Sequence, residues 1–474
     1  MKNAAIKILC LTLCLMLTGC ANAEGTVQDS ESVQDELSAE GNEQENETVG
    51  QESTEVVEAS VSQEQERGSE EQVEEIPFSS DFYEYESMAD LLGEYGIRFG
   101  TCMNATTSQD YTLQGLVGQH FNSITATNDM KAYCLLDQNA SMKAADGMPV
   151  MDYSGSLPII EAAMNNGAQV RGHVLVWDAN MSSWFFKEGY KSNGAYVDRA
   201  TMLKRLESYI TQVINYYEEN YPGVIYCWDV VNEAVGDSAS DYEGDDARHV
   251  RKVRGGAENL FYTVIGDDYV ELSFLYARNA IEALQQKNPE LDIKLFYNDY
   301  STFQDNKCNA ICELVKSINS FAKDSDGNYR KLADGVGMQG YIGGYGTQSG
   351  CMSAGDIPKI KKAINKYAEL GVEVQITEMS VRNYKNDVLT VNNHKRFYRM
   401  LMEALVEINS GEEKPLTAIC IWGLTDMATI DKNSYSYKMN GCYNGLFTPG
   451  YEVKEAFHEV YVMLKEKQAE KQAQ

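Results

Sequence analysis

The chain has 474 residues, with 71 acidic and 40 basic side chains and a formal net charge of -31. This length is sufficient for one large domain with additional segments. A nucleic-acid-binding face must be basic, so we expect no nucleic acid partner. The charge is uneven, because residues 21–77 hold eighteen Asp or Glu and a single basic residue, and so contribute -17. The acidity is therefore mainly a property of that segment and says little about a substrate.

The first twenty residues are typical of an export signal. Two lysines precede an apolar run at residues 8–19, which is shorter than the roughly 20 residues that a membrane-spanning helix needs. The run ends in LTGC at residues 17–20, which resembles the lipobox of bacterial lipoproteins and implies a lipid anchor on Cys20. The alternative is an ordinary secretory signal cut after Ala23. We interpret residues 1–20 as a lipoprotein signal peptide and expect an extracellular protein, anchored by lipid to the outer face of the bacterial cell membrane.

The acidic segment at residues 21–77 is rich in Glu, Gln and Ser and contains no aromatic residue. Such a composition cannot bury enough apolar surface to fold. We therefore predict a disordered linker, which at this length spans about 40 Å on average. It would hold the domain that follows away from the membrane.

The cysteines do not indicate a disulfide framework or a metal site. Eight of the eleven lie outside the signal and are scattered, and neither CxxC nor zinc-site spacing occurs. Cys308 and Cys312 are four residues apart on a predicted helix, which leaves a bridge between them open. We predict neither a metal ion nor a cofactor.

From residue 78 onward, short apolar runs alternate with longer helical patterns. Helices are predicted at 201–221, 269–287 and 357–371, among others. The predicted strands are residues 97–102, 121–125, 169–176, 224–231, 293–297, 335–339, 373–377 and 417–422. Eight strands separated by helices predict an α/β fold of the (β/α)8 TIM barrel type over residues 78–474.

Two of these strands lead into a glutamate. The fourth strand is followed by Glu233 in CWDVVNEA, and the seventh is followed by Glu378 in VEVQITEMS. In such barrels the chemistry occurs at the carboxyl ends of the strands. Charged groups are costly to bury unless they are paired or used, so the pattern favours an active site with two carboxylates. The alternative is a pair of solvated carboxylates at strand ends.

The segments WDVVNEA and ITEMS resemble the two signatures of glycoside hydrolase family 10, the retaining endo-β-1,4-xylanases. Other segments of the chain also resemble the family and occur in the family's order, namely MADLLGEYGIRFGT, HFNSITATNDMK, RGHVLVW, KLFYNDY, DGVGMQG and IWGLTD. The resemblance covers most of residues 88–460. It implies that Glu233 is the general acid/base and Glu378 the nucleophile, and that the substrate is a polysaccharide such as xylan. We expect a monomer.

The same resemblance implies contacts with the sugars. Asn232 would bind the 2-hydroxyl of the sugar under attack, and His173 and Trp177 would line the non-reducing side of the cleft. The complete set of implied substrate-binding residues is Asn128, Lys131, His173, Trp177, Asn232, Asn298, Gln339, Tyr341 and Trp422.

Several positions depart from the family's pattern. Thr127 replaces a glutamate, Tyr341 a histidine and Ser380 an aspartate, while Ile430 stands where a second tryptophan is usual. The two positions Asp178 and Asn180 hold neither the usual histidine nor the usual glutamine.

These departures surround the expected sugar site and bear on substrate preference. They leave open a retaining enzyme for another β-glycan, such as a glucan, and a lipoprotein that binds glycans without catalysis. Tyr341 and Ser380 are both hydroxyls that can donate to Glu378 and favour its ionised form. We expect Tyr341 to be the donor.

Overall fold

The computed structural model describes residues 76–237, 239–343 and 355–473, all within the unit of the chain that runs from Gly50 to Gln474. The predicted signal peptide at 1–20, its Cys20 and all but the last two residues of the predicted linker at 21–77 lie outside the described residues. No helix in the part of the chain that the structure describes is long and apolar enough to cross a membrane.

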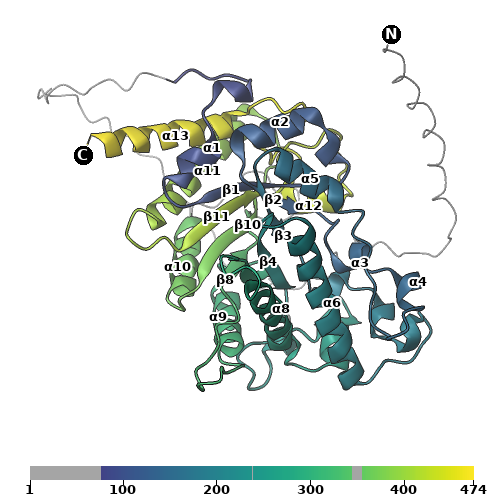
Figure 1. Ribbon diagram of the computed structural model, residues 1–474. Coiled ribbons are helices and arrows are strands. Elements are labelled where there is room, and N and C mark those ends of the chain that lie inside the picture. The colour runs from purple at the N-terminus through teal and green to yellow at the C-terminus, as the bar shows by residue number, and fades with distance from the viewer. Residues whose placement is uncertain (1–75, 238, 344–354, 474) are drawn as a thin grey trace, which may run out of the picture. The chain divides into compact units, whose positions relative to one another are not determined.

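Eight parallel strands form a closed barrel (Figure 1). In chain order they are β1 (Arg98–Met103), β2 (Ser123–Ala126), β3 (Gln169–Gly172), β4 (Ile225–Asn232), β7 (Lys294–Asp299), β8 (Gly335–Met338), β10 (Glu373–Val381) and β11 (Leu416–Ile421). Closure occurs at β11, where Ala418 pairs with Arg98 of β1 on one side and with Gln375 of β10 on the other. The predicted (β/α)8 fold is thereby confirmed.

A helix follows each barrel strand, and these helices surround the barrel (Figure 1). They are α2 (Tyr111–His120), α5 (Leu157–Asn165), α6 (Arg199–Asn220), α8 (Tyr269–Gln285), α9 (Asp305–Asn319), α10 (Asp356–Ala368), α11 (Val388–Ile408) and α13 (Glu455–Gln472). Aspartates before three of them, Asp110, Asp198 and Asp387, accept hydrogen bonds from backbone N–H groups of the first turn and fix where these helices begin.

The remaining elements are short. They include α1 (Met88–Gly93), α3 (Ala132–Leu135), α4 (Gln138–Ser141), α7 (Leu260–Val264), α12 (Tyr435–Asn440) and the 3-10 turn η4 (Asp178–Asn180). After β4, an antiparallel hairpin joins β5 (Val253–Arg254) to β6 (Ala257–Glu258). The short strand β9 (Tyr341–Ile342) pairs with the end of β10.

Two strand boundaries differ from the sequence prediction. β3 ends at Gly172, whereas the prediction extended it to residue 176. β10 runs to Val381 and therefore contains Glu378, which was expected to follow the strand. The extra pairing of Ser380 with Tyr341 in β9 continues the strand beyond its apolar stretch. A single-strand pattern cannot reveal such a partner.

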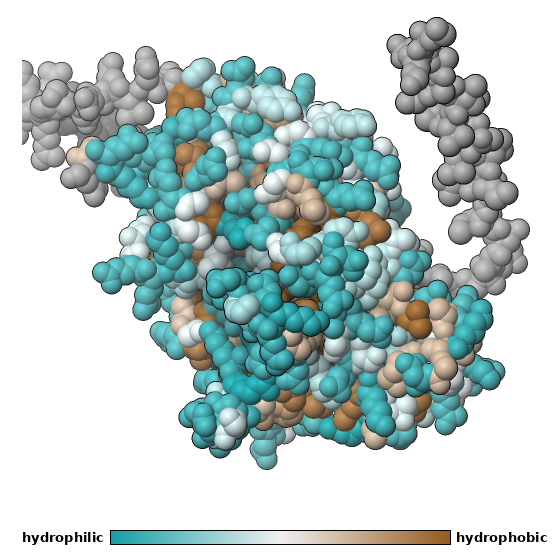
Figure 2. Space-filling view, in the orientation of Figure 1, coloured by the Kyte–Doolittle hydropathy of each residue, from teal (hydrophilic) through white to brown (hydrophobic). Residues whose placement is uncertain are grey.

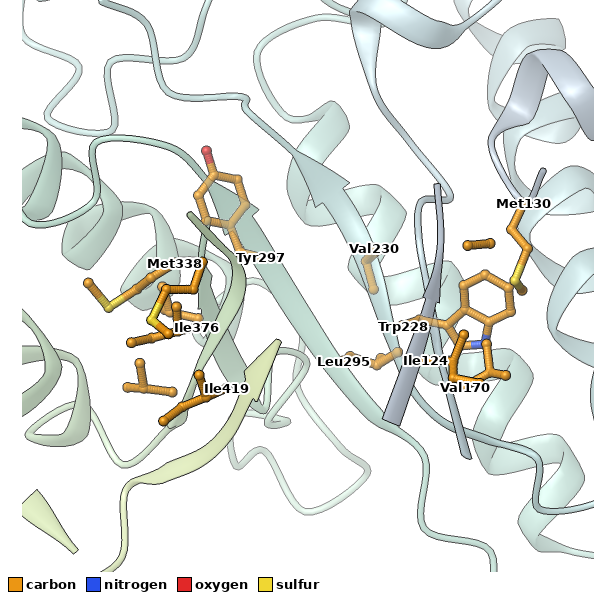
Figure 3. Packing of buried hydrophobic residues seen from close by; sticks show 14 of the residues in the cluster. Ile124, Met130, Val170, Trp228, Val230, Leu295, Tyr297, Met338, Ile376 and Ile419 are labelled. Atoms are coloured by element: carbon orange, nitrogen blue, oxygen red, sulfur yellow. The ribbon is translucent and has the colours of Figure 1, made fainter. Parts of the chain in front are cut away.

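The apolar core lies between the barrel and its helices. Figure 3 shows Trp228 near Ile124 and Val170, which pair on adjacent strands. Trp228 is fully buried, and its ring centroid lies 5.8 Å from that of Tyr217 on α6. A Cβ on Gly172 would lie 2.3 Å from the Trp228 ring, so this strand position requires glycine. On the outer surface, Figure 2 shows mainly hydrophilic side chains with small apolar patches.

Alternate residues of β4 face the barrel interior, where polar groups gather. Cys227 donates its thiol hydrogen to Oε1 of Gln375 on β10, across the barrel, at 3.8 Å.

Cys308 and Cys312 both lie on α9, and both are free thiols, so the bridge left open by the sequence is not formed.

Candidate active site

The carboxyl ends of the barrel strands bring the expected site residues together. Glu233 follows β4 directly, Glu378 lies in β10 and Asn298 lies in β7. Others come just after a strand, namely Asn128 and Lys131 after β2, His173 and Trp177 after β3, Gln339 after β8 and Trp422 after β11. The parallel arrangement places all these ends at one edge of the barrel, which is why residues far apart in sequence form one site.

The backbone of Glu233 is held in an unusual conformation. Its φ is 56°, in the left-handed region that residues other than glycine seldom adopt. Its N–H donates to the carbonyl oxygen of Asn298 at 2.8 Å, and its own carbonyl oxygen accepts from Arg251 and Arg254, each at 3.1 Å. These bonds compensate for the local strain and fix the direction in which the Glu233 side chain leaves the strand.

Each carboxylate oxygen of Glu233 accepts a hydrogen bond. Nε2 of Gln339 donates to Oε1 at 2.9 Å, and Nη1 of Arg254 donates to Oε2 at 2.7 Å. Arg254 is in turn paired with Asp178. Glu233 itself is buried, with 5% of its surface exposed, so these partners replace water around its carboxyl group.

Glu378 has different surroundings. Its Oε2 accepts a hydrogen bond of 2.6 Å from the Tyr341 hydroxyl, and its Oε1 accepts one of 3.2 Å from Nδ2 of Asn298. Burial raises the pKa of Glu378 above its ordinary value, while His173 and the Tyr341 hydrogen bond act to lower it and Glu233 adds to the rise. The expected donation by Tyr341 is present, but burial outweighs its effect on the pKa.

A chain of amide side chains joins the two glutamates. The side-chain oxygen of Asn232 accepts from Nδ2 of Asn298 at 3.0 Å and from Nε2 of Gln339 at 3.3 Å. Asn298 also donates to Glu378, and Gln339 also donates to Glu233. Thr377 donates to the side-chain oxygen of Asn298 at 2.7 Å and so fixes its orientation. The two carboxyl groups therefore belong to one hydrogen-bonded array.

A fully buried ion pair holds the His173 ring in its orientation. Its Nδ1 lies 2.8 Å from Oδ2 of Asp229, and both oxygens of Asp229 accept from the guanidinium of Arg171. Arg171 also donates through Nε to Gln375 at 2.8 Å. Burial alone would raise the pKa of Asp229, but the Arg171 charge and the His173 contact hold it below its ordinary value. An ionised Asp229 fixes the ring that faces the site.

Lys131 and Trp177 lie together near the glutamates. Nζ of Lys131 donates to Oδ1 of Asn128 at 2.9 Å and lies 5.0 Å from the centre of the Trp177 ring. Burial lowers the pKa of Lys131, while the charges of Glu378 and Glu233 act against this change. Lys131 thus places a positive charge within electrostatic reach of both glutamates.

Trp177 and Asn232 each hold an unpaired donor at this edge. Within the described ranges, Nε1 of Trp177 and Nδ2 of Asn232 are buried and have no hydrogen-bond partner. Buried donors usually find a partner, and sugar hydroxyls are suitable acceptors. Trp422 is half-buried directly after β11, and its backbone N–H donates to the carbonyl oxygen of Met379, the residue after Glu378.

A family model described as glycosyl hydrolase family 10 matches residues 87–462, which is most of the chain. The chain belongs to glycosyl hydrolase family 10. A curated relative from Caldicellulosiruptor saccharolyticus is 34% identical over 310 residues, which cover 64% of this chain and 89% of that protein. Endo-1,4-beta-xylanase B of Butyrivibrio fibrisolvens is 31% identical over 350 residues, which cover 73% of this chain but about half, 48%, of that enzyme.

A solved structure agrees with this membership. It contains modules of an endo-1,4-beta-D-xylanase from Clostridium thermocellum, complexed with xylohexaose. The match has a TM-score of 0.66 and 28% sequence identity, and covers 81% of this chain and 68% of that chain.

The structure shows the surroundings of the positions at which this chain departs from the family 10 sequence pattern. Tyr341 replaces the usual histidine and still contacts Glu378, as described above. The partner of the Ser380 hydroxyl is Asn444, from whose Nδ2 it accepts a hydrogen bond of 2.9 Å. Ile430 lies in the segment after β11 and is 45% exposed. Asp178 stands where the family usually has a histidine, and it forms an ion pair with Arg254.

The sequence interpretation missed several residues of this family 10 site. Arg254 and Arg251 contact Glu233, yet they come from the segment VRKVRGG, whose sequence shows no strand or helix pattern. Arg171 and Asp229 lie in predicted strands, but neither residue was predicted to belong to the site. Their charges, in otherwise apolar strands, were a signal of buried pairing that could have been used.

Proposed function

We propose that this chain is an endo-1,4-beta-xylanase that hydrolyses β-1,4-xylosidic linkages in xylan with retention of configuration. The observation that carries the proposal is the hydrogen-bonded array from Glu233 through Gln339, Asn232 and Asn298 to Glu378. It supplies two buried carboxyl groups with different partners, as a two-carboxylate hydrolase requires. Membership of family 10 and the xylanase names of its relatives support the same function.

In the first step, a carboxylate oxygen of Glu378 attacks the anomeric carbon of the sugar. The bond from that carbon to the glycosidic oxygen breaks, and the proton of Glu233 passes to the leaving oxygen. Glu378 is then esterified to the sugar and Glu233 is ionised. Asn298 and Tyr341, which each donate to Glu378, hold the attacking carboxylate in place.

In the second step, Glu233 acts as a base. It removes a proton from water while the water oxygen attacks the anomeric carbon, and the bond to Glu378 breaks. Two displacements at one carbon restore its original configuration. The free Asn232 and Trp177 donors are suited to the hydroxyls of the bound sugar, and the Trp177 ring offers an apolar face that a sugar ring packs against.

We also propose that the enzyme acts outside the cell, held by a lipid on Cys20. The support is the sequence of residues 1–20 and the acidic composition of residues 21–77. Cys20→Ala should release the enzyme from the membrane fraction, measured by xylanase activity in washed membranes and in the medium. Cleavage after Ala23 predicts instead that wild type and variant are equally soluble.

The central experiment compares xylan and cellulose as substrates for purified wild-type protein. Reducing-sugar release from xylan well above that from cellulose is the expected result. Release mainly from cellulose would assign the enzyme to another β-glycan. Binding to xylan without release of sugar would show a glycan-binding protein instead. Glu378→Ala is the control that excludes a contaminating hydrolase.

A further inference from the structure

Arg254 connects the expected acid/base to a second carboxylate. Its Nη1 donates to Oε2 of Glu233 at 2.7 Å, while its Nε and Nη2 donate to the two oxygens of Asp178 at 2.9 and 2.8 Å. The exposed fractions of these side chains are 6% for Arg254, 6% for Glu233 and 4% for Asp178. Ion pairs shielded from water in this way interact far more strongly than surface pairs.

The three charges come from three separate segments. Glu233 follows β4, Arg254 lies in the β5–β6 hairpin and Asp178 begins the η4 turn after β3. The contact with Asp178 uses two parallel N–H donors, the geometry in which a guanidinium binds a carboxylate best. Arg254 is therefore fixed chiefly by Asp178, with its third donating nitrogen directed at Glu233.

This arrangement bears on a conflict in the reaction. Glu233 must carry a proton in the first step and be ionised in the second. Arg254 and Gln339 each donate to one of its oxygens, which favours the ionised form. The negative charge of Asp178 offsets that of Arg254. Protonation of Glu233 leaves an internally neutral Arg254–Asp178 pair beside it.

We propose that Arg254 and Asp178 are positioning residues that set, with opposite signs, the protonation equilibrium of Glu233. Arg254 favours the carboxylate that removes a proton from water, and Asp178 limits this effect so that the proton can return. The inference rests on the proposed function, since it concerns the acid/base of that reaction.

Other ionisable and charged groups also face Glu233. They come from the loops after β2 and β4, from β7 and the residue that follows it, and from β10, and they are Lys131, Arg251, Asp299, Tyr300 and Glu378. None of them is changed in the variants below. A shift between variants therefore reports the Arg254–Asp178 pair against a constant background.

The alkaline limb of the kcat/KM profile reports the loss of the proton from the free enzyme's general acid, which is Glu233 in the proposed function. Arg254→Met removes a positive charge and should move this limb upward by about one pH unit or more. Asp178→Asn leaves Arg254 unbalanced and should move the limb downward. The double variant should lie between the two, close to wild type, and Arg254→Lys should also stay near wild type because it keeps the charge.

Lys252→Met is the matched control. Lys252 precedes the same hairpin, is exposed, and loses the same charge in the same substitution. The alkaline limb of the kcat/KM profile of this variant should not move. Shifts of opposite sign in the two single variants, with return in the double variant, support the inference. Shifts of equal sign, or a loss of rate with an unmoved limb in correctly folded Arg254→Met, overturn it and leave Arg254 as a structural residue.

A substrate-free measurement separates this inference from the proposed function. In protein labelled with ¹³C at glutamate carboxyls, the Glu233 signal is assigned by its loss in Glu233→Gln and then titrated in each variant. The same opposite shifts are expected there. If wild type does not hydrolyse xylan but the shifts occur, the proposed function fails and the pairing stands. If xylan is hydrolysed and the shifts are absent, only the inference fails.

Discussion

The hydroxyl of Tyr341 donates a hydrogen bond of 2.6 Å to Oε2 of Glu378. Tyr341 lies in β9 and Glu378 in β10, and the pairing of Ser380 with Tyr341 sets their register. A short bond to a buried carboxylate favours its charged form. The tyrosine therefore does chemically what the family's histidine is expected to do at this position, with a neutral donor.

Tyr341→Phe tests this contact, because it removes only the hydroxyl. Burial already raises the pKa of Glu378, and loss of the donor should raise it further. The acid limb of kcat/KM, which reports the ionisation of the base in the free enzyme, should move to higher pH by about one unit. The measurement is a pH series with an aryl xylobioside. An unmoved limb at full activity would make Tyr341 part of the wall of the cleft.

Substitution of the two glutamates should have different consequences. Glu378→Ala should abolish turnover on every substrate while the fold is retained, because no nucleophile remains. Glu233→Ala should reduce kcat/KM by about 10²–10⁴-fold on xylan but much less on activated aryl glycosides, whose leaving groups need little protonation. Equal losses on both substrate types in Glu233→Ala would contradict its role as the acid. Circular dichroism checks folding.

Ile430 is expected to influence the choice between xylose and glucose units. In the family, the tryptophan at this position crowds the sugar's C5 edge and disfavours a hydroxymethyl group, and isoleucine is smaller. Ile430→Trp should raise the preference for aryl xylobioside over aryl cellobioside by at most about 1–3 kcal/mol in transition-state free energy. The ratio of the two kcat/KM values is the measurement. An unchanged ratio would refute this assignment.

The buried pair behind His173 should contribute strongly to stability. Arg171 and Asp229 are both 0% exposed, and Arg171→Met leaves the Asp229 charge without its partner. Breaking such a pair costs about 3–5 kcal/mol in the free energy of unfolding. Arg199→Met is the control, since its pair with Asp268 is 45% and 31% exposed and should contribute less than about 1 kcal/mol. Urea unfolding of both variants gives the comparison, and equal losses would contradict the prediction.

The buried Arg171–Asp229 pair also predicts how the free energy of unfolding depends on pH. The pKa of Asp229 is lower in the folded protein than in the unfolded chain. Its contribution is therefore complete above the unfolded pKa of about 3.9 and is lost as the pH falls through the folded value. Asp229→Asn should be destabilised at pH 7, and the difference from wild type should narrow in acid. A difference that stays constant from pH 7 to pH 3 would exclude this origin.

Local patterns were sufficient for the barrel and for the two glutamates. A β-rich run ending in a polar residue marks a strand and its carboxyl end, and a barrel places such ends at one edge. The positions of Glu233 and Glu378 could therefore be predicted, whereas His173 was proposed only through the family resemblance of RGHVLVW. The same reasoning placed Glu378 after its strand, and this was wrong because β9 extends the pairing of β10.

What surrounds these residues was decided by tertiary structure alone. Arg254 is 21 positions from Glu233 in a hairpin that the sequence pattern did not predict, and Arg171 is 204 positions from Gln375. No periodicity connects such pairs, because their contact depends on how a loop packs over the barrel and on which side chains share its interior. Electrostatic interactions depend on distance and burial, and neither quantity exists until the chain has folded. The sequence by itself determined which groups can carry out the chemistry, and the folded structure determined the charges that control them.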